Sequence, residues 1–400
     1  IISTDCTPYS DWMSEAVVHS HFASGTEGRI TRIASCSDPG YEYPAVWHPR
    51  MDIQVTPNFE EQKAPNGKVD KYPIYNKPMG ISHWLRNQGA SLHPDTVVVM
   101  VDTDMLIAAP LQEAFGDGGG GLRVRRGQPA AQVYLIGSQW FTRLGCLEML
   151  RDVCGSSCKD TEEKDVAGHY VVGAPYALTK SDWEALAPLW TEYTLRVRQV
   201  SGGWMDDMYG YVLAAMHLGL RHAMTASLML SNAKVSSGEA WHLAGSSLDP
   251  ENRSRSYASK NGLFEPRLSS SQNPVPPILH YCQTYSLRGY DTGAHFRFSK
   301  YEQGKAPLGF ANCSALPIPP YDFSKIEKFE KDESLDVETR KNAYMLRRVV
   351  EGIQKALVHY REAACPNGAP PPVESPVGKF AAHSRPIFGT KKHKESMESM

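Results

Sequence analysis

Two aspartates that lie two residues apart follow a continuous run of apolar residues. Residues 97–101 read Val-Val-Val-Met-Val, and Asp102-Thr103-Asp104 comes directly after them. Such a run is typical of a strand buried on both faces, as in a parallel sheet covered by helices. The two carboxylates are therefore expected at the carboxyl edge of a sheet, where open α/β folds bind their ligands.

Oxygen ligands at this edge predict a site for a divalent metal ion. Carboxylates suit Mn²⁺ or Mg²⁺, and such an ion commonly bridges a protein to a diphosphate. A nucleotide-sugar glycosyltransferase holds its donor in this way. The alternative is an Asp-rich turn after a strand, because Asp is a common turn residue and short motifs often occur without the function.

Helix-like and strand-like patterns alternate around this acidic corner. Apolar spacing of three and four residues predicts helices, and short apolar runs predict strands. The expected helices cover residues 11–22, 76–87, 181–197, 203–219 and 333–362, and the expected strands cover residues 30–35, 97–101, 133–137, 223–230 and 278–281. Residues 48–75, 116–121 and 245–273 are expected to form a long loop, a flexible connection and a surface excursion. This alternation favours an α/β nucleotide-binding fold.

The helix expected at residues 181–197 carries two finer predictions. Ser181 and Glu184 have the spacing of a capping box at its start. Pro188 predicts a kink or a restart of the helix, because proline has no backbone N–H to donate.

The composition favours a globular chain without a nucleic-acid footprint. A length of 400 residues allows two or three domains, or one large α/β domain with additions. The formal net charge of −2 lacks the basic excess of nucleic-acid-binding proteins. The sequence holds no apolar run of about 18 residues that would predict a membrane span. Because residue 1 is Ile, we expect a natural signal or anchor ahead of this chain.

Cysteines and glycosylation patterns favour the lumen of the secretory pathway. The cysteines are Cys6, Cys36, Cys146, Cys154, Cys158, Cys282, Cys313 and Cys365, and the glycosylation patterns are Asn252-Arg253-Ser254 and Asn312-Cys313-Ser314. An even number of cysteines in this context predicts disulfides, with ordinary buried thiols as the alternative. Cys154 and Cys158 have no second pair at zinc-site spacing, so a structural zinc is not favoured.

A series of short motifs resembles one family of plant and algal enzymes, the peptidyl O-glycosyltransferases. This family includes peptidyl serine α-galactosyltransferases and hydroxyproline O-arabinosyltransferases. The resemblance covers residues 1–321 and depends on the shared order of the motifs rather than on any single one. The motifs are Thr31-Arg32-Ile33-Ala34-Ser35-Cys36, Tyr72-Pro73-Ile74-Tyr75-Asn76-Lys77-Pro78, His83-Trp84-Leu85, Val101-Asp102-Thr103-Asp104-Met105, Tyr134-Leu135-Ile136-Gly137, Ala187-Pro188-Leu189-Trp190, Gly203-Trp204-Met205-Asp206-Asp207-Met208-Tyr209-Gly210-Tyr211, Leu279-His280-Tyr281, Asn312-Cys313 and Pro319-Pro320.

The resemblance implies a GT-A-like fold, with a central, mostly parallel sheet flanked by helices. It implies a metal-dependent, retaining transfer of a sugar, galactose first, from a UDP-sugar to a serine hydroxyl of a hydroxyproline-rich glycoprotein. The alternative within the family is transfer of L-arabinofuranose to hydroxyproline. The pair Asp102 and Asp104 favours the galactosyltransferase branch, whereas Asp207 departs from the pattern, because the family usually has Glu there.

Five residues are expected to hold the metal and the donor. Asp104 is implied as a direct ligand of Mn²⁺ or Mg²⁺, and His280 as a third protein ligand with a core histidine as its alternative. Asp102 is expected to bind the metal through water or to hold the uridine ribose. Lys77 is expected on the diphosphate oxygens, or as a solvated lysine, and Asn76 on donor hydroxyls, or as a helix cap.

Asp206 and Asp207, at the start of the predicted helix 203–219, are the acidic candidates for catalysis. Asp207 is expected to orient the sugar or to stabilise an oxocarbenium-like transition state. Asp206 is expected to interact with the helix dipole. Front-face attack, in which the leaving phosphate accepts the proton of the incoming hydroxyl, does not require the carboxylate pair of retaining glycosidases.

Three aromatic residues beside these aspartates are candidates for the acceptor site. Trp204, Tyr209 and Tyr211 are expected to line a groove for an extended, proline-rich peptide, whose backbone is already ordered before it binds. The alternative is a place in the core, where aromatic residues at such spacing often lie.

The expected organisation has three parts. Residues 1–321 form the GT-A-like catalytic domain, residues 322–364 a C-terminal helical extension, and residues 365–400 a mobile tail. We expect an enzyme of the Golgi or endoplasmic reticulum lumen, as a type II membrane protein or a lumenal protein. A catalytically inactive, lectin-like or scaffold member of the fold is the alternative from another class.

Overall fold

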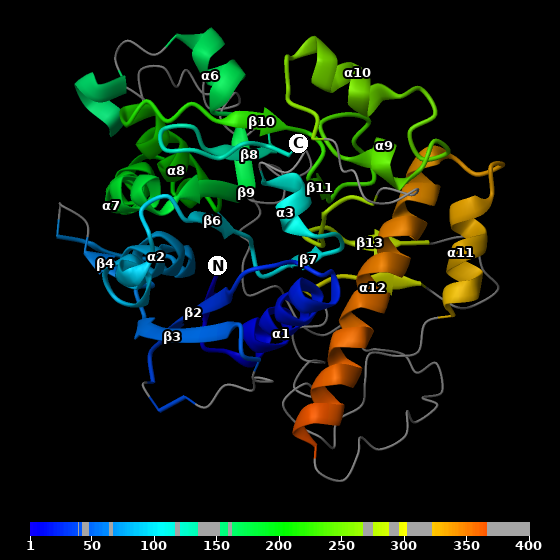
Figure 1. The fold of residues 1–400 in the computed structure, drawn as a ribbon, viewed down its shortest axis with the longest axis horizontal. Helices are drawn as coiled ribbons and strands as arrows, with labels where there is room; N and C mark the ends of the chain where they lie inside the picture. The colour runs from blue at the N-terminus through cyan, green and yellow to red at the C-terminus, as the bar shows by residue number, and fades with distance from the viewer. Residues whose placement is uncertain are drawn as a thin grey trace.

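Strands and helices alternate along the chain, so the α/β prediction is confirmed (Figure 1). The computed structural model describes residues 1–38, 40–41, 48–63, 67–116, 121–134, 153–158, 162–266, 275–287, 296–301 and 322–365. Several predictions concern other residues and therefore lie outside this description. They include those for residues 117–120, for residues 135–137 of the expected strand 133–137, for residues 267–273 of the expected surface excursion, for Cys146, Asn312 and Cys313, and for the tail at residues 366–400.

Two sheets, of three and four strands, join into the central sheet of the described chain. The first has the order β1 (Ile2–Asp5), β2 (Ile30–Cys36) and β3 (Met51–Pro57), and all of its pairs are parallel. The second has the order β10 (Ala223–Thr225), β8 (Ala130–Val133), β9 (Val172–Thr179) and β6 (Val97–Met100). Only β9 runs against its neighbours within these described strands.

Backbone hydrogen bonds connect the two sheets through β1 and β6. The Ile1 nitrogen donates to the Val99 carbonyl at 2.6 Å, and the Val101 nitrogen donates to the Ile1 carbonyl at 3.1 Å. In a parallel pair of strands, one residue forms hydrogen bonds with the two residues on either side of the residue opposite to it. The combined order β3-β2-β1-β6-β9-β8-β10 is therefore mostly parallel, as predicted.

The strand β6 differs in one respect from its prediction. Val98, Met100 and Val101 are buried, but Val97 is 39% exposed. Val97 is the first residue of β6, at the end of the strand away from Asp102. The carboxyl end that carries the aspartates is the well-buried end.

The predicted loop at residues 48–75 is wrong in part, because it contains the edge strand β3. Residues Asp52, Gln54 and Thr56 alternate with apolar ones, and an edge strand pairs on one side only, so this segment does not resemble a buried strand. The same segment also contains β4 (Glu61–Lys63), β5 (Val69–Lys71) and η1 (Pro73–Tyr75).

Helices cover both faces of the central sheet (Figure 1). On one face lie α2 (Asn76–Arg86), α7 (Lys180–Val200) and α8 (Asp206–His217). On the other face lie α1 (Pro8–Ala23) and, packed against it, α12 (Val337–Ala364). The indole of Trp183 donates to the Val98 carbonyl at 3.0 Å, so the apolar side of α7 is anchored to β6.

The start and the interior of α7 correct two predictions. The N-cap is Thr179, whose hydroxyl accepts from the Asp182 nitrogen at 3.2 Å, rather than the Ser181 and Glu184 box. Pro188 lies inside α7, and the helix continues to Val200 without a restart.

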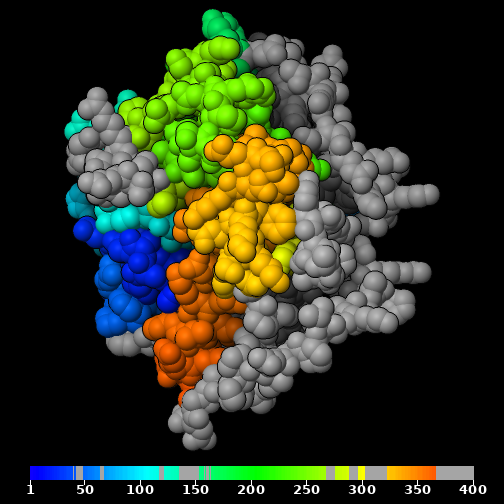
Figure 2. Space-filling model, turned by 90° about the vertical axis from the view of Figure 1, so that its right-hand side faces the viewer, coloured from blue at the N-terminus to red at the C-terminus, as the bar shows by residue number. Residues whose placement is uncertain are grey.

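A third sheet and the C-terminal helices complete the described fold. The expected strand 223–230 divides into β10 and β11 (Met229–Leu230), and β11 pairs with β12 (Ile278–His280), which pairs with β7 (Met105–Ile107). α12 packs over this sheet and α1, and together they enclose a second core cluster. Figure 2 shows α11 (Phe323–Lys331) and α12 lying beside the segment that holds α9 and α10. The remaining elements are η2 (Gln88–Ser91), α3 (Leu111–Ala114), η3 (Gly155–Cys158), α6 (Glu163–His169), α9 (Trp241–Ala244), α10 (Arg253–Lys260), β13 (Tyr285–Ser286) and β14 (Arg297–Phe298).

Disulfides occur as the cysteine count predicts. Cys6 is bonded to Cys36, and Cys154 to Cys158, so the latter pair is a disulfide rather than part of a zinc site. Cys365 is also in a disulfide, whereas Cys282 is free. Within the described residues, no helix is both long and apolar enough to cross a membrane.

Candidate active site

Asp102, Asp104 and His280 converge at the carboxyl end of β6. The aspartates follow β6 directly, and the antiparallel pair β12 and β7 places His280 opposite Met105. Each of the three side chains offers a ligand atom within 4.8 Å of the other two. The Nε2 atom of His280 lies 3.3 Å from Oδ1 of Asp104, and both side chains are buried.

The donor set of this triad fits a divalent metal ion. Two carboxylates and an imidazole are ligands that Mn²⁺ accepts, and carboxylates also suit Mg²⁺. Asp104, Asp102 and His280 are the residues that would hold the ion. The ammonium groups of Lys77 and Lys300 lie against the two carboxylates.

Each carboxylate of the triad pairs with its own lysine. Nζ of Lys77 lies 2.9 Å from Oδ1 of Asp102 and 3.3 Å from Oδ2 of Asp207. Nζ of Lys300 forms an ion pair and a hydrogen bond with Oδ2 of Asp104. Sequence reasoning missed Lys300, because it follows β14 in a segment without a motif, and only the fold brings it to Asp104.

Burial and neighbouring charges change the pKa values of Asp104, His280 and Lys77. Burial would raise the pKa of Asp104, but Lys300 and His280 outweigh it and hold this pKa well below its ordinary value. Burial would lower the pKa of His280, but Cys282 and Asp104 outweigh it and raise this pKa well above its ordinary value. Burial would likewise lower the pKa of Lys77, which Asp102 and Asp207 raise instead.

Asp207 lies on the same lysine at the start of α8. Its Oδ1 is 3.1 Å from the Tyr72 hydroxyl, which also donates to the Trp204 carbonyl at 2.5 Å. The indole of Trp190 donates to the Asp207 carbonyl at 2.6 Å and fixes the first turn of α8 on α7. Burial raises the pKa of Asp207, against the opposing effect of Lys77. Both of its carboxylate oxygens therefore have a partner, Tyr72 or Lys77.

Asp206 faces away from the metal triad, toward Arg198. Its Oδ2 lies 3.3 Å from Nη1 of Arg198, and its Oδ1 accepts from the Ser201 hydroxyl. Burial raises its pKa to about 6, although Ser201 and Arg198 lower it. Arg198 also binds the Asp70 carboxylate, at 2.9 and 3.0 Å, so it ties the β4–β5 hairpin to the end of α7. This geometry supports the structural interpretation of Asp206.

Asn76, the other predicted donor residue, is buried in the first turn of α2. Its Oδ1 accepts from the Phe59 nitrogen at 2.7 Å, and the helix N-cap is Tyr75. Asn76 therefore holds the segment before β4 on α2, and it does not cap the helix.

The three candidates for the acceptor site differ in how deeply they are buried. Trp204 is 46% exposed, and its ring lies edge-on to Tyr72, with 6.2 Å between the centroids. Tyr209 is partly buried and packs against the core. Tyr211 is fully buried, stacks on Tyr176 and bonds His222, so it is a core residue and lines no groove.

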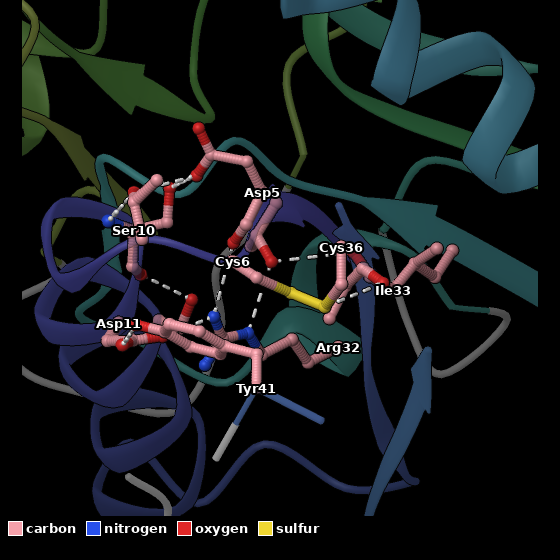
Figure 3. Close-up of polar contacts among 12 residues, drawn as sticks. Asp5, Cys6, Ser10, Asp11, Arg32, Ile33, Cys36 and Tyr41 are labelled. Carbon is pink, nitrogen blue, oxygen red and sulfur yellow. Dashed lines mark hydrogen bonds and ion pairs between the residues drawn. A yellow bond between two sulfur atoms is a disulfide. The ribbon is translucent and has the colours of Figure 1, made fainter. Parts of the chain in front are cut away.

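A polar network surrounds the end of β1, and sequence reasoning did not identify it (Figure 3). Arg32, which is fully buried on β2, pairs with Asp11 of α1 at 2.6 Å, and the Tyr41 hydroxyl donates to the same carboxylate at 2.7 Å. The Asp5 carboxylate accepts from the hydroxyls of Thr7, at 3.0 Å, and Ser10. With the adjacent disulfide from Cys6 to Cys36, these contacts fix the turn between β1 and α1.

A cavity of about 710 Å³ opens at the carboxyl ends of β2 and β3. None of the predicted site residues lines it. Its walls include Cys36, Pro57, Glu60, Glu61 and His83. The chemistry of the triad, and not the size of this cavity, identifies the candidate active site.

Comparison with known proteins matches nearly half of the chain to one family model. Residues 31–224 match the family model described as the hydroxyproline O-arabinosyltransferase family N-terminal domain. A peptidyl serine alpha-galactosyltransferase of Arabidopsis thaliana is 30% identical over 58% of this chain and 27% of its own length. One of Chlamydomonas reinhardtii is 25% identical over 55% of this chain and 30% of its own length. Hydroxyproline O-arabinosyltransferase 3 of Arabidopsis thaliana is 25% identical over 44% of each chain.

The matches cover less than half the length of each of these relatives. Among solved structures, the galactosyltransferase LgtC with donor and acceptor sugar analogs has a TM-score of 0.40 and 12% identity, over 71% of this chain and 87% of that one. An active-site mutant of LgtC has a TM-score of 0.41 and 12% identity, over 77% and 95%. At these TM-scores the likeness adds nothing to the fold assignment, which rests on the strand order.

Proposed function

We propose that this chain is a peptidyl O-glycosyltransferase, because its residues 31–224 match the model of the hydroxyproline O-arabinosyltransferase family N-terminal domain. Its donor is a UDP-sugar, and its acceptor is a hydroxyl group of a hydroxyproline-rich polypeptide. The first choice is transfer of galactose to serine, because two of the relatives are peptidyl serine alpha-galactosyltransferases. Transfer of arabinofuranose to hydroxyproline is the second candidate, because the family model and the third relative carry that name.

The observation that carries this proposal is the triad of Asp102, Asp104 and His280 with a lysine on each carboxylate. Carboxylates and an imidazole suit Mn²⁺, and ammonium groups beside them suit phosphate oxygens. When bound, the ion would supply electrostatic stabilisation of the charge on the leaving diphosphate. A site for a metal and a diphosphate is what a nucleotide-sugar donor needs.

The residues of the chain then have distinct roles. Lys77 and Lys300 bind diphosphate oxygens, and Asp207 orients Lys77 and the Tyr72 hydroxyl, with which both of its oxygens interact. Because both carboxylate oxygens of Asp207 already have partners, a role in orienting these groups is favoured over nucleophilic attack by Asp207. The transfer retains configuration by front-face attack, in which the leaving phosphate accepts the proton of the acceptor hydroxyl. Trp204, exposed beside Tyr72, contacts the acceptor peptide.

The disulfides support a place in the secretory lumen. Disulfides persist in oxidising compartments and are rare in the cytosol. Cys6, Cys36, Cys154, Cys158 and Cys365 are all in disulfides. We place the enzyme in the Golgi or endoplasmic reticulum lumen.

The test is UDP release from UDP-galactose and UDP-L-arabinofuranose with a Ser- and Hyp-rich peptide, with and without Mn²⁺. We expect peptide-dependent and Mn²⁺-dependent turnover with one of the two donors. If the protein melts cooperatively but turns over neither donor, this result would contradict the proposal and favour a lectin-like or scaffold member of the fold.

A further inference from the structure

We propose that Lys77 and Lys300 make the binding of the divalent cation and the binding of the diphosphate conditional on each other. This inference rests on the proposed function, because it concerns the same site. It goes beyond that function because it assigns a specific effect to the two lysines. They weaken the binding of the cation alone and favour the binding of the cation together with the diphosphate.

The geometry places one ammonium group on each metal carboxylate. Lys77 reaches Asp102 from α2, and Lys300 reaches Asp104 from the segment after β14. The side chains of both lysines are mostly buried, at 20% and 15% exposure. Bulk water therefore screens these charges weakly, and the two ammonium groups act on anything that binds between them.

Charge balance at this corner explains the coupling. The carboxylates of Asp102, Asp104 and Asp207 balance the ammonium groups of Lys77 and Lys300 to within one charge, so a cation that arrives alone must compete with an ammonium group at each metal carboxylate. A diphosphate that arrives alone meets the two carboxylates. When both arrive, the cation takes the carboxylates and the diphosphate takes the lysines, and every charge has a partner. Each ligand thus raises the affinity for the other by the same factor.

Asp207 gives Lys77 a second partner for this exchange. Its Oδ2 is 3.3 Å from Nζ of Lys77, and its side chain is 4% exposed. When Asp102 turns to the cation, Lys77 keeps a counter-charge and remains in the site. Lys300 lies against the ring of Tyr301, with 5.0 Å from Nζ to the ring centroid, which gives it a comparable support.

The test is calorimetric titration of the whole chain with Mn²⁺ alone, and with Mn²⁺ in the presence of saturating UDP. The variants are Lys77→Met and Lys300→Met. The control is Lys355→Met, which removes the same charge from an exposed lysine of α12 that pairs with Glu351. Thermal melting checks that each variant is folded.

For the wild-type chain we expect UDP to tighten Mn²⁺ binding by about tenfold or more. Each lysine variant is expected to bind Mn²⁺ alone several-fold more tightly, to bind UDP with Mn²⁺ more weakly, and so to lose most of the coupling. The control is expected to match the wild type. Lys77→Arg and Lys300→Arg, which keep the charge, are expected to retain the coupling.

Two results would overturn the inference. One is unchanged or weaker binding of Mn²⁺ alone in both methionine variants while UDP still tightens it as in the wild type. The other is loss of the coupling in the arginine variants. A wild-type chain that binds neither Mn²⁺ nor UDP would instead contradict the proposed function, so the two failures are distinguishable.

Discussion

At the scale of single residues, the side chain of Asp104 has two roles. It is the expected direct ligand of the metal, and it is also the counter-charge of Lys300 and His280. Removing one member of a buried ion pair leaves the other charge without compensation. A loss of activity after its substitution therefore needs a measurement that separates binding from stability.

We expect Asp104→Ala to abolish Mn²⁺-dependent UDP binding and to lower the free energy of unfolding by about 3 kcal/mol, because two buried cations lose their partner. The double variant Asp104→Ala/Lys300→Met is expected to recover part of that stability without recovering Mn²⁺ binding. Urea unfolding and calorimetric titration measure the two effects. Unaltered UDP binding in Asp104→Ala would show that the residue is not a metal ligand.

Asp206 gives a prediction for pH dependence. Burial raises its pKa in the folded chain to about 6, from 3.8. The folded chain therefore binds more protons than the unfolded chain between these values, and the free energy of unfolding falls as pH rises through this window. The largest effect is about 3 kcal/mol, since one pKa unit corresponds to about 1.4 kcal/mol.

Urea unfolding of wild type and Asp206→Asn at pH 4.5 and pH 7 measures this effect. We expect the wild type to lose stability relative to the variant between the two pH values, because Asp206 becomes charged in this range and the variant has no carboxyl group at this position. A difference between the two proteins that stays constant with pH would contradict the raised pKa.

At the scale of elements, the sequence predicted best where a local pattern is strong. The spacing of Trp183, Leu186 and Trp190 predicts α7, and the apolar run before Asp102 predicts the strand that positions the triad. Contacts between distant segments have no such signal. The edge strand β3 looks like a loop, because polar residues alternate along it, and Lys300 is 196 residues from Asp104 along the chain. Tyr211 shows the reverse case, since aromatic spacing does not distinguish a groove from a core.

The contact between α7 and α8 positions Asp207 and gives the prediction at this scale. A Cβ atom on Gly210 would lie 2.4 Å from the Thr194 hydroxyl and 2.7 Å from the Thr194 nitrogen. We expect Gly210→Ala to force the helices apart, to cost about 1–3 kcal/mol of stability and to reduce turnover. Urea unfolding measures the cost.

Gly168→Ala is the matched control, because it is also helical and a Cβ atom there meets nothing within 4 Å. We expect it to be neutral or to stabilise the chain by up to about 1 kcal/mol. Equal stability of the Gly210 and Gly168 variants would contradict the close contact of α7 and α8.

At the scale of the whole molecule, α12 belongs to the same folded unit as the site. The second core cluster combines Trp12 of α1, Leu106 of β7 and Leu279 of β12 with Met345 and Leu346 of α12. β7 and β12 are also the strands that bring His280 to Asp104. The predicted helical extension therefore covers the far side of the elements that hold the triad.

We expect a chain that ends at residue 336, and so lacks α12, to lose its cooperative thermal transition, because the apolar residues of the second cluster become exposed. A chain that ends at residue 365 keeps α12 and is expected to keep the transition. Calorimetry measures both. A cooperative transition near the wild-type temperature in the shorter chain would show that α12 is an independent addition.

The central claim is that Asp102, Asp104 and His280 hold a divalent cation against the diphosphate of the donor. Its most direct test is a crystal structure with UDP and Mn²⁺, in which anomalous scattering locates the ion. We predict the manganese peak within coordination distance of Asp104 and His280, with the diphosphate between Lys77 and Lys300. Manganese and UDP bound elsewhere, with the two lysines still paired to the aspartates, would contradict the account.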